Sequence, residues 1–200
     1  MAHMSPFHRL PNSTVIDFDD VPDSTVIDTH YANRGVTFAA ITTNPPSQSH
    51  AYARQAVTAK TQPNGVSLVP YPYAPFFDAR AGGIQATFTV PQIYVSIFAQ
   101  AILLPENISP ATNKPFMEAF DQQDNLLQTV FYGPNWGEPT YGSWQALTIQ
   151  STSANIDHVV FSSQHHDDVD VFALFDHLVF TPQLLRIALG GQGHPILRPA

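Results

Sequence analysis

The 200-residue chain contains no cysteine, which excludes disulfide bonds, thiolate zinc sites and a cysteine nucleophile. Charged residues are scarce, at 12% of the chain, and the eight lysines and arginines are outnumbered by sixteen aspartates and glutamates. Because phosphate binding needs a basic surface, the net charge of −8 argues against a nucleic-acid partner. No apolar run approaches the ~18 residues of a membrane-spanning helix, so no membrane span is expected.

The residues that are present favour strands joined by loops. The chain has eighteen prolines, and its acidic residues are thirteen aspartates against three glutamates, a bias toward turns rather than helices. Apolar residues make up 44% of the chain, enough for a sizeable core in one domain. Period-two alternation dominates from Thr14 onward and indicates about nine strands without intervening helices. This pattern predicts a β-sandwich or barrel.

The composition along the chain suggests one domain with short flanking segments. Residues 13–181 are expected to form the β domain. Residues 1–12 are interpreted as a tag remnant or leader, and residues 182–200 as a short helix followed by a tail. The letters STVID occur twice, at Ser13–Asp17 and Ser24–Asp28. Since stacked repeats need at least three units, we interpret the two copies as a coincidence of strand composition.

Several elements are expected from local patterns. Residues 114–133 predict a β-hairpin with a polar turn at Asp121–Asn125. Two separate strands are expected on either side of Pro91. The Pro/Ser-rich residues 44–55 and the aromatic residues 70–83 are expected to be loops.

Four segments resemble the jelly-roll modules of the galactose-binding-domain-like superfamily, which includes carbohydrate-binding modules. They are IDFDDVPDSTVIDTHYANRGVTF, MEAFDQQDNLLQTV, WQALTIQSTSANIDHVVFSS and LFDHLVFT. The resemblance covers residues 13–181 and implies an antiparallel jelly-roll β-sandwich. It also implies a secreted or cell-surface bacterial domain that binds a glycan or polysaccharide without catalysis.

The resemblance also implies a calcium site. In calcium-bearing modules of this type, an acidic pair on the first strand meets an aspartate on the last. Asp17 and Asp19, expected to share one strand face, match the pair, and Asp176 matches the closing aspartate, although His177 follows it where Asn or Trp is usual. Calcium takes six to eight oxygens, so a structural Ca²⁺ tying the two strands together is predicted. The alternative is that these aspartates cap turns and strand ends.

Two aromatic loops are the candidate glycan site. Sugar rings stack on aromatic faces, while amide and charged groups bond to their hydroxyls. The candidate ligand-binding residues are Trp136, Tyr141, Asn135, Glu138, Tyr71, Tyr73 and Arg80. The alternative is that these aromatic side chains close the ends of the core.

A histidine cluster keeps two other functions open. The chain shows no nucleophile elbow, HExxH, P-loop or Rossmann glycine pattern, so no motif indicates catalysis. His165, His166 and Asp168 would nevertheless supply two imidazoles and a carboxylate if they lie in a loop. A metal-dependent hydrolase or lyase is therefore one alternative. A structural or adhesive surface domain is the other.

Overall fold

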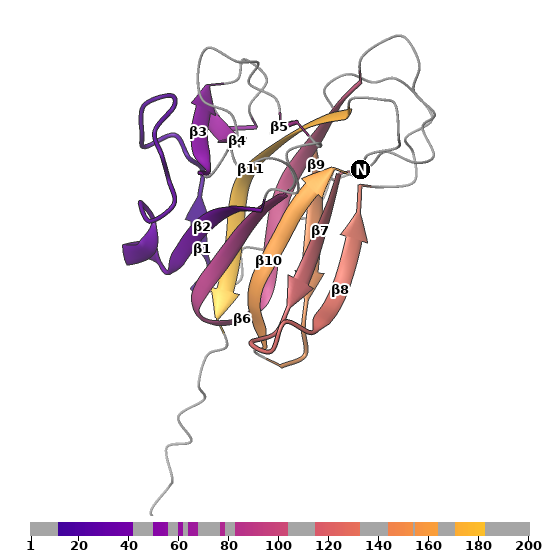
Figure 1. Ribbon diagram of the computed structural model, residues 1–200. Helices are drawn as coiled ribbons and strands as arrows, with labels where there is room; N and C mark the ends of the chain where they lie inside the picture. The colour runs from indigo at the N-terminus through magenta and orange to yellow at the C-terminus, as the bar shows by residue number, and fades with distance from the viewer. Residues whose placement is uncertain are drawn as a thin grey trace, which may run out of the picture.

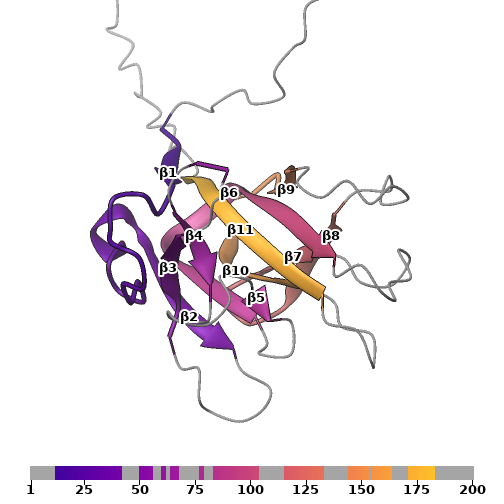
Figure 2. The same ribbon diagram turned by 90° about the horizontal axis from the view of Figure 1, so that it is seen from above.

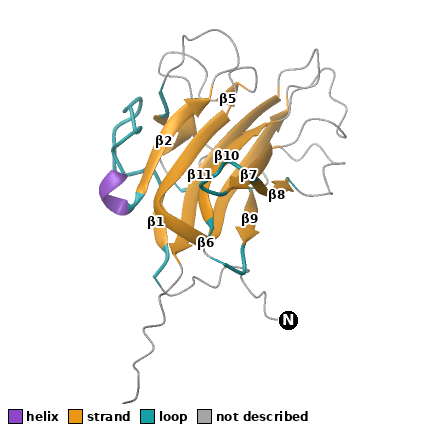
Figure 3. Cartoon of the chain, turned by 60° about the horizontal axis from the view of Figure 1, so that its bottom comes forward, coloured by secondary structure: helices purple, strands orange, loops and turns teal. Residues whose placement is uncertain are grey.

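The computed structural model describes residues 12–41, 50–55, 60–61, 64–67, 77–78, 83–103, 115–132, 144–153, 155–163 and 171–182. The strands in this part are β1 (Thr14–Ile16), β2 (Val36–Ile41), β3 (Tyr52–Gln55), β4 (Asn64–Ser67), β5 (Phe77–Asp78), β6 (Gly83–Leu103), β7 (Pro115–Phe120), β8 (Leu126–Phe131), β9 (Gln145–Gln150), β10 (Ile156–Ser163) and β11 (Val171–Pro182). Its one helical element is the short 3₁₀ turn η1 (Ala32–Arg34), beside β2 (Figure 3). No helix among these residues is long and apolar enough to cross a membrane.

The long strand β6 belongs to both layers of a sandwich. Its residues 83–88 pair with β2 and β10, and β7 and β8 continue that layer, in the order β2–β6–β10–β7–β8. Its residues 92–103 pair with β9 and β11, and the other edge of β11 pairs in turn with β5, β4 and β1. All these pairs are antiparallel, and β3 and β8 lie at opposite sides of the molecule (Figures 1 and 2).

The expectation of two strands separated by Pro91 is wrong, because β6 runs through this residue. Pro91 stands between the two paired halves of β6, where pairing passes from one layer to the other. A residue without an N–H is tolerated at such a position.

The expected hairpin is confirmed as β7 and β8. Its turn is held by Asp121, whose Oδ1 accepts hydrogen bonds from the N–H groups of Gln123 and Asn125, both at 2.9 Å. Asp124 adopts a left-handed conformation with φ 59°, which aspartate tolerates better than most residues.

The two expected loops both contain strands. Tyr52–Gln55 forms β3, which pairs with β4, and Phe77–Asp78 forms β5, which pairs with β11. On β3 only Ala53 and Arg54 are buried, and this pattern is too short to predict a strand after the Pro/Ser-rich residues. Gly65 of β4 allows β4 to approach β11, since a Cβ there would lie 2.8 Å from the carbonyl oxygen of Phe175. The predicted leader, C-terminal helix and tail lie outside the described residues, except for their innermost positions.

The first strand is shorter than expected. It ends at Ile16, because Phe18 has φ 60° and its fully buried ring packs against the rings of Tyr31 and Phe38, with centroids 5.9 and 5.7 Å away. The expectation that Asp17 and Asp19 share one strand face is therefore wrong, since the chain turns between them. The second STVID copy forms turns with a single β-bridge, so the two copies differ in structure.

The core lies between the two layers. It consists of the inward side chains of both, with large, fully buried members drawn from distant parts of the chain. The largest of these are Tyr31, Phe18, Phe161, Phe175, Ile16, Ile27, Ile84, Ile97, Met117 and Leu147. Burial of this apolar surface is the main stabilising contribution to the sandwich.

Candidate functional site

The predicted calcium residues lie where the first strand meets the last. We call Asp17, Asp19 and Asp176, together with Thr61 and Asn64, the acidic junction. The N–H of Thr61 donates to Oδ2 of Asp176 at 2.7 Å, and its hydroxyl donates to the carbonyl oxygen of Asp17 at 3.3 Å. Thr61 thus connects the end of β1 to β11.

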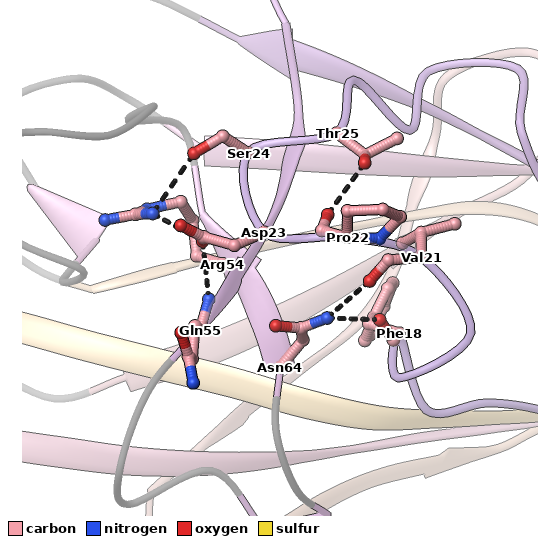
Figure 4. A network of polar contacts seen from close by, with 9 residues as sticks. All are labelled: Phe18, Val21, Pro22, Asp23, Ser24, Thr25, Arg54, Gln55 and Asn64. Carbon is pink, nitrogen blue, oxygen red and sulfur yellow. Dashed lines mark hydrogen bonds and ion pairs between the residues drawn. The ribbon is translucent and has the colours of Figure 1, made fainter.

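Asn64 makes the second connection of the acidic junction. Its N–H donates to Oδ1 of Asp19 at 2.8 Å. Its side-chain amide donates to the carbonyl oxygens of Phe18 and Val21, at 3.1 and 2.7 Å (Figure 4). Asn64 is only 1% exposed, so these bonds are made inside the protein, where they hold the turn after β1 in place.

Asp176 is the most deeply buried acid of the junction, with no exposed surface. Burial raises its pKa to about 7, the hydrogen bonds from Thr61 and His177 oppose that rise, and the nearby charge of Asp19 adds to it. The N–H of His177 donates to its Oδ1 at 2.6 Å. His177 itself has φ 55° and sits at a register shift between β11 and β6. The carboxyl group thus anchors an irregular point of the last strand.

The acidic junction is held together by hydrogen bonds in this structure. Among the residues that the structure describes, no three His, Asp or Glu side chains are placed to hold an ion together. Both oxygens of Asp176 accept N–H donors, and three backbone carbonyls of the turn accept donors from Thr61 and Asn64. These oxygens point to donors rather than converging on one point. Calcium stays a prediction.

A neighbouring network explains a further aspartate of the acidic stretch. Arg54, 4% exposed, pairs with Oδ1 of Asp23 at 2.5 Å and donates to the hydroxyl of Ser24 at 3.2 Å (Figure 4). Burial raises the pKa of Asp23, but hydrogen bonds from the N–H of Gln55 and from Arg54, with the Arg54 charge, outweigh it and leave the pKa below its ordinary value. This aspartate therefore fixes the turn after β1 against β3.

A second region lies on the opposite side of the molecule, on strand β7. Met117 and Ala119 of this strand are fully buried, whereas Phe116, Glu118 and Phe120 alternate with them and are only half-buried. Since successive side chains of a strand point to opposite faces, these three point away from the core. They form the centre of what we call the outer face, completed by Thr129 and Phe131 of β8 and His158 of β10.

The neighbouring strands place a partner beside each of the three β7 residues. Phe131 lies opposite Phe116, with ring centroids 6.2 Å apart. Thr129 lies opposite Glu118 and donates its hydroxyl to Oε1 at 3.3 Å. On the other side of β7, His158 of β10 lies opposite Phe120. The two rings stack with their centroids 5.1 Å apart and an interplanar angle of 8°.

Phe120 is held in place by its histidine partner. His158 is 7% exposed, and its Nδ1 lies 3.2 Å from a carboxylate oxygen of Asp157. Its Nε2 lies 3.7 Å from Asp124 in the hairpin turn. The Nδ1 contact orients the ring, so His158 gives Phe120 a flat surface to stack on.

The outer face has the chemistry of a sugar-binding surface. It offers two aromatic positions with a hydrogen-bonding carboxylate between them, all on rigid strands. Phe131 remains 46% exposed, so part of its ring is available to a ligand. Leu126 and Leu127, 54% and 36% exposed, extend the apolar surface along the edge strand.

The predicted glycan and histidine sites are not described by the structure. Outside the described residues lie Trp136, Tyr141, Asn135, Glu138, Tyr71, Tyr73, Arg80, His165, His166 and Asp168. The structure thus brings together the predicted acidic residues only. The predictions for the aromatic loops and the histidine cluster stay predictions.

The outer face was missed in the sequence, although a signal for it exists. In the segment PFMEAF both faces of the strand carry apolar residues. Met117 and Ala119 lie on one face, and Phe116 and Phe120 lie on the other. A strand of a two-layer sandwich needs only one apolar side. Two aromatic residues on the remaining side therefore indicate a ligand or a covering segment.

Comparison with known proteins supports the fold. No family model matches the chain, and no curated protein matches it. Among solved structures, the K2 cleaved adhesin domain of Lys-gingipain is similar with a TM-score of 0.50, at 13% identity, over 84% of this chain and 99% of that one. The predicted fold class, an antiparallel jelly-roll β-sandwich, is confirmed.

Two carbohydrate-binding modules are more distant neighbours. The xylan-binding module CBM15 aligns with a TM-score of 0.42 and 13% identity, over 85% of this chain and 97% of that one. TmCBM61, solved in complex with β-1,4-galactotriose, aligns with a TM-score of 0.36 and 9% identity, over 86% and 90%. At these identities the likeness concerns the fold alone.

Proposed function

We propose that this protein is a non-catalytic glycan-binding module and that the outer face is its binding surface. The observation that carries the proposal is the line of Phe116, Glu118 and Phe120 on β7, each with a cross-strand partner. The distant similarity to modules that bind xylan and galactotriose agrees with a glycan ligand. A secreted or cell-surface location is part of the same proposal.

The proposed mechanism uses the spacing of strand residues. Phe116 and Phe120 are four residues apart, which corresponds to about 13 Å along a strand. Two aromatic positions at that separation would contact different rings of one saccharide chain. Glu118, held by Thr129, would accept hydrogen bonds from sugar hydroxyls between them.

Loop residues would add to this surface. Residues 133–143, which connect β8 to β9 in the chain, contain Trp136, Tyr141, Asn135 and Glu138. Because they follow the end of β8 closely in sequence, we keep them in the proposed site. Tyr71, Tyr73 and Arg80 of residues 70–83 are kept as a second group.

A structural Ca²⁺ at the acidic junction is proposed separately. What supports it is the match of Asp17, Asp19 and Asp176 to calcium-bearing jelly-roll modules and the charge of Asp19 near buried Asp176. Metal analysis of protein purified without chelator tests it. About one calcium per chain supports the ion, and no calcium with no effect of EDTA on the melting temperature contradicts it.

Glycan binding is tested with a panel of soluble neutral, amine-bearing and acidic polysaccharides in affinity gel electrophoresis, comparing the intact protein with Phe120→Ala. Retardation by at least one polysaccharide, lost in the variant, supports the proposal. A circular dichroism melt of the variant checks that its fold is retained. Absence of retardation by neutral, amine-bearing and acidic polysaccharides alike would contradict the proposal of glycan binding.

Protein adhesion is the second candidate function. The exposed side chains of Leu126 and Leu127 on the edge strand β8 favour it, because such strands readily pair with another chain. It predicts self-association in solution and no glycan binding, which analytical ultracentrifugation and the same panel would show. The hydrolase or lyase alternative rests on His165, His166 and Asp168, and stoichiometric binding of a transition metal would support it.

A further inference from the structure

We propose that the outer face selects its ligand by charge, with Glu118 as the residue that excludes saccharides bearing carboxylate or sulfate groups. This inference rests on the proposed function and names the ligand class, a glycan without acidic groups.

Glu118 lies at the centre of the outer face. It stands between Phe116 and Phe120 on β7, and its cross-strand neighbours are Thr129 on β8 and Val160 on β10. Any saccharide chain that contacts both aromatic positions must pass over this carboxylate. Glu118 is therefore close to the ligand rather than at the margin of the surface.

The carboxylate of Glu118 has a neutral partner. Thr129 donates a hydroxyl to it, and none of the ion pairs found among the described residues includes Glu118. A hydroxyl satisfies one acceptor site without neutralising the charge. The negative charge is thus presented to the ligand.

Among the described residues, two further carboxylates lie near the outer face. Asp124 and Asp157 lie beside His158, at the Phe120 end. The cationic side chains within the described residues are engaged elsewhere: Arg34 with Asp20, Arg54 with Asp23, and Lys60 over the ring of Phe98 at 4.9 Å. With a net charge of −8 for the chain, the local and the overall field both oppose an anionic ligand.

The physical consequence is a difference between ligands of the same shape. An acidic group placed over Glu118 meets a like charge at short range, whereas a hydroxyl donates a hydrogen bond to it. An amine-bearing sugar should bind more tightly than a neutral one, because the aromatic faces and the carboxylate both attract its cation. The expected order of affinity is amine-bearing, then neutral, then acidic.

The test uses one polysaccharide in two matched forms. The neutral polysaccharide retained most strongly in the panel is converted to its carboxymethyl and hydroxyethyl derivatives at equal degrees of substitution. These differ in charge but place substituents of similar size at the same hydroxyls. Affinities for both are measured at low ionic strength and again at about 0.5 M salt, where charge effects at the protein surface are largely screened.

Two variants isolate Glu118. Glu118→Gln keeps the shape and an oxygen that accepts from Thr129 but removes the charge. Asp20→Asn removes one charge from the far side of the molecule, where Asp20 is 47% exposed and Asn still accepts from Tyr31. It controls for the change in net charge.

We expect the carboxymethyl form to bind at least about tenfold more weakly than the hydroxyethyl form, a difference of about 1.4 kcal/mol. Glu118→Gln should bring the two within about threefold, and Asp20→Asn should leave the ratio unchanged. Equal binding of both forms, preference for the acidic form, or a ratio unaffected by Glu118→Gln would overturn the inference and leave glycan binding intact. If no polysaccharide of any charge binds, the proposed function itself fails.

Discussion

The acidic junction and the outer face use polar side chains in opposite ways. In the junction, Asp176 and Asn64 are buried and their polar atoms are satisfied by nearby backbone and by Thr61. On the outer face, Glu118 and the aromatic rings beside it remain half-exposed with capacity for further contacts. The region richest in chemically conspicuous residues therefore holds the fold together, while an ordinary-looking strand carries the proposed binding surface.

The largest expected effect concerns pH and Asp176. Because its pKa is raised from 3.8 to about 7 in the folded protein, the folded state keeps a proton that the unfolded state has lost. The free energy of unfolding should fall as pH rises from about 4 to about 7, by up to about 4 kcal/mol. Chemical denaturation across this range, with Asp176→Asn as the comparison, measures it.

The Asp176→Asn variant distinguishes the titration of Asp176 from that of the other ionisable groups. Asn cannot ionise, so Asp176→Asn should lose the pH dependence that the native residue causes. A bound Ca²⁺ would instead hold Asp176 ionised. Asp176→Asn would then be less stable than the native protein at pH 7. Equal pH profiles for both proteins would contradict the account of the junction.

The next effect comes from the buried cation beside the junction. Asp23→Ala leaves Arg54 almost fully buried without its carboxylate, so we expect a loss of about 3 kcal/mol in the free energy of unfolding. In an Arg54→Met background the same substitution should cost much less, because no buried charge remains. Denaturant titration of the four proteins of this cycle gives the coupling energy. If the losses in the free energy of unfolding from the two substitutions simply add, the Asp23–Arg54 ion pair is not the cause of the loss.

Much of the fold was predictable from the sequence, and the failures share a cause. The alternation in residues 114–133 was strong enough to predict the hairpin, and the late strands were equally clear. The errors at Phe18, Pro91 and Tyr52–Gln55 arose where tertiary packing overrides local preference. Phe18 is drawn into the core at a left-handed φ, and Pro91 is tolerated only because β6 changes partners there.

A smaller effect distinguishes the two regions by function. Phe131→Ala removes a half-exposed ring from the outer face, so it should weaken glycan binding about tenfold while changing stability little. Val26→Ala, which removes exposed apolar surface from the loop near β3, should leave binding unchanged. Affinity electrophoresis and thermal melts of both variants provide the measurement. Equal losses of binding would argue for nonspecific apolar contact.

The smallest expected effect is that of Thr129→Val. This change removes the hydroxyl that holds Glu118 while keeping the shape of the side chain, so binding should weaken only about twofold to threefold and stability should change by less than about 1 kcal/mol. Isothermal titration with the best neutral polysaccharide resolves such a change. A loss as large as that of Phe131→Ala would mean that the Thr129 hydroxyl itself contacts the ligand.

The candidate site was predictable only in part, for physical reasons. Asp17, Asp19 and Asp176 were predicted from the sequence as calcium ligands, and this stays a prediction, but their oxygens were not expected to accept donors from Thr61 and Asn64. Those two residues are distant in the chain and carry no motif. The outer face depends on cross-strand neighbours, which a single strand pattern does not specify.

The most direct test is to locate the binding surface by amide chemical shifts during titration with a neutral oligosaccharide from the best panel hit. We predict that the largest shifts fall on β7, β8 and β10, around Phe116, Glu118 and His158, with the acidic junction unaffected. Shifts confined to the acidic junction or to other segments would contradict the claim that the outer face binds the ligand.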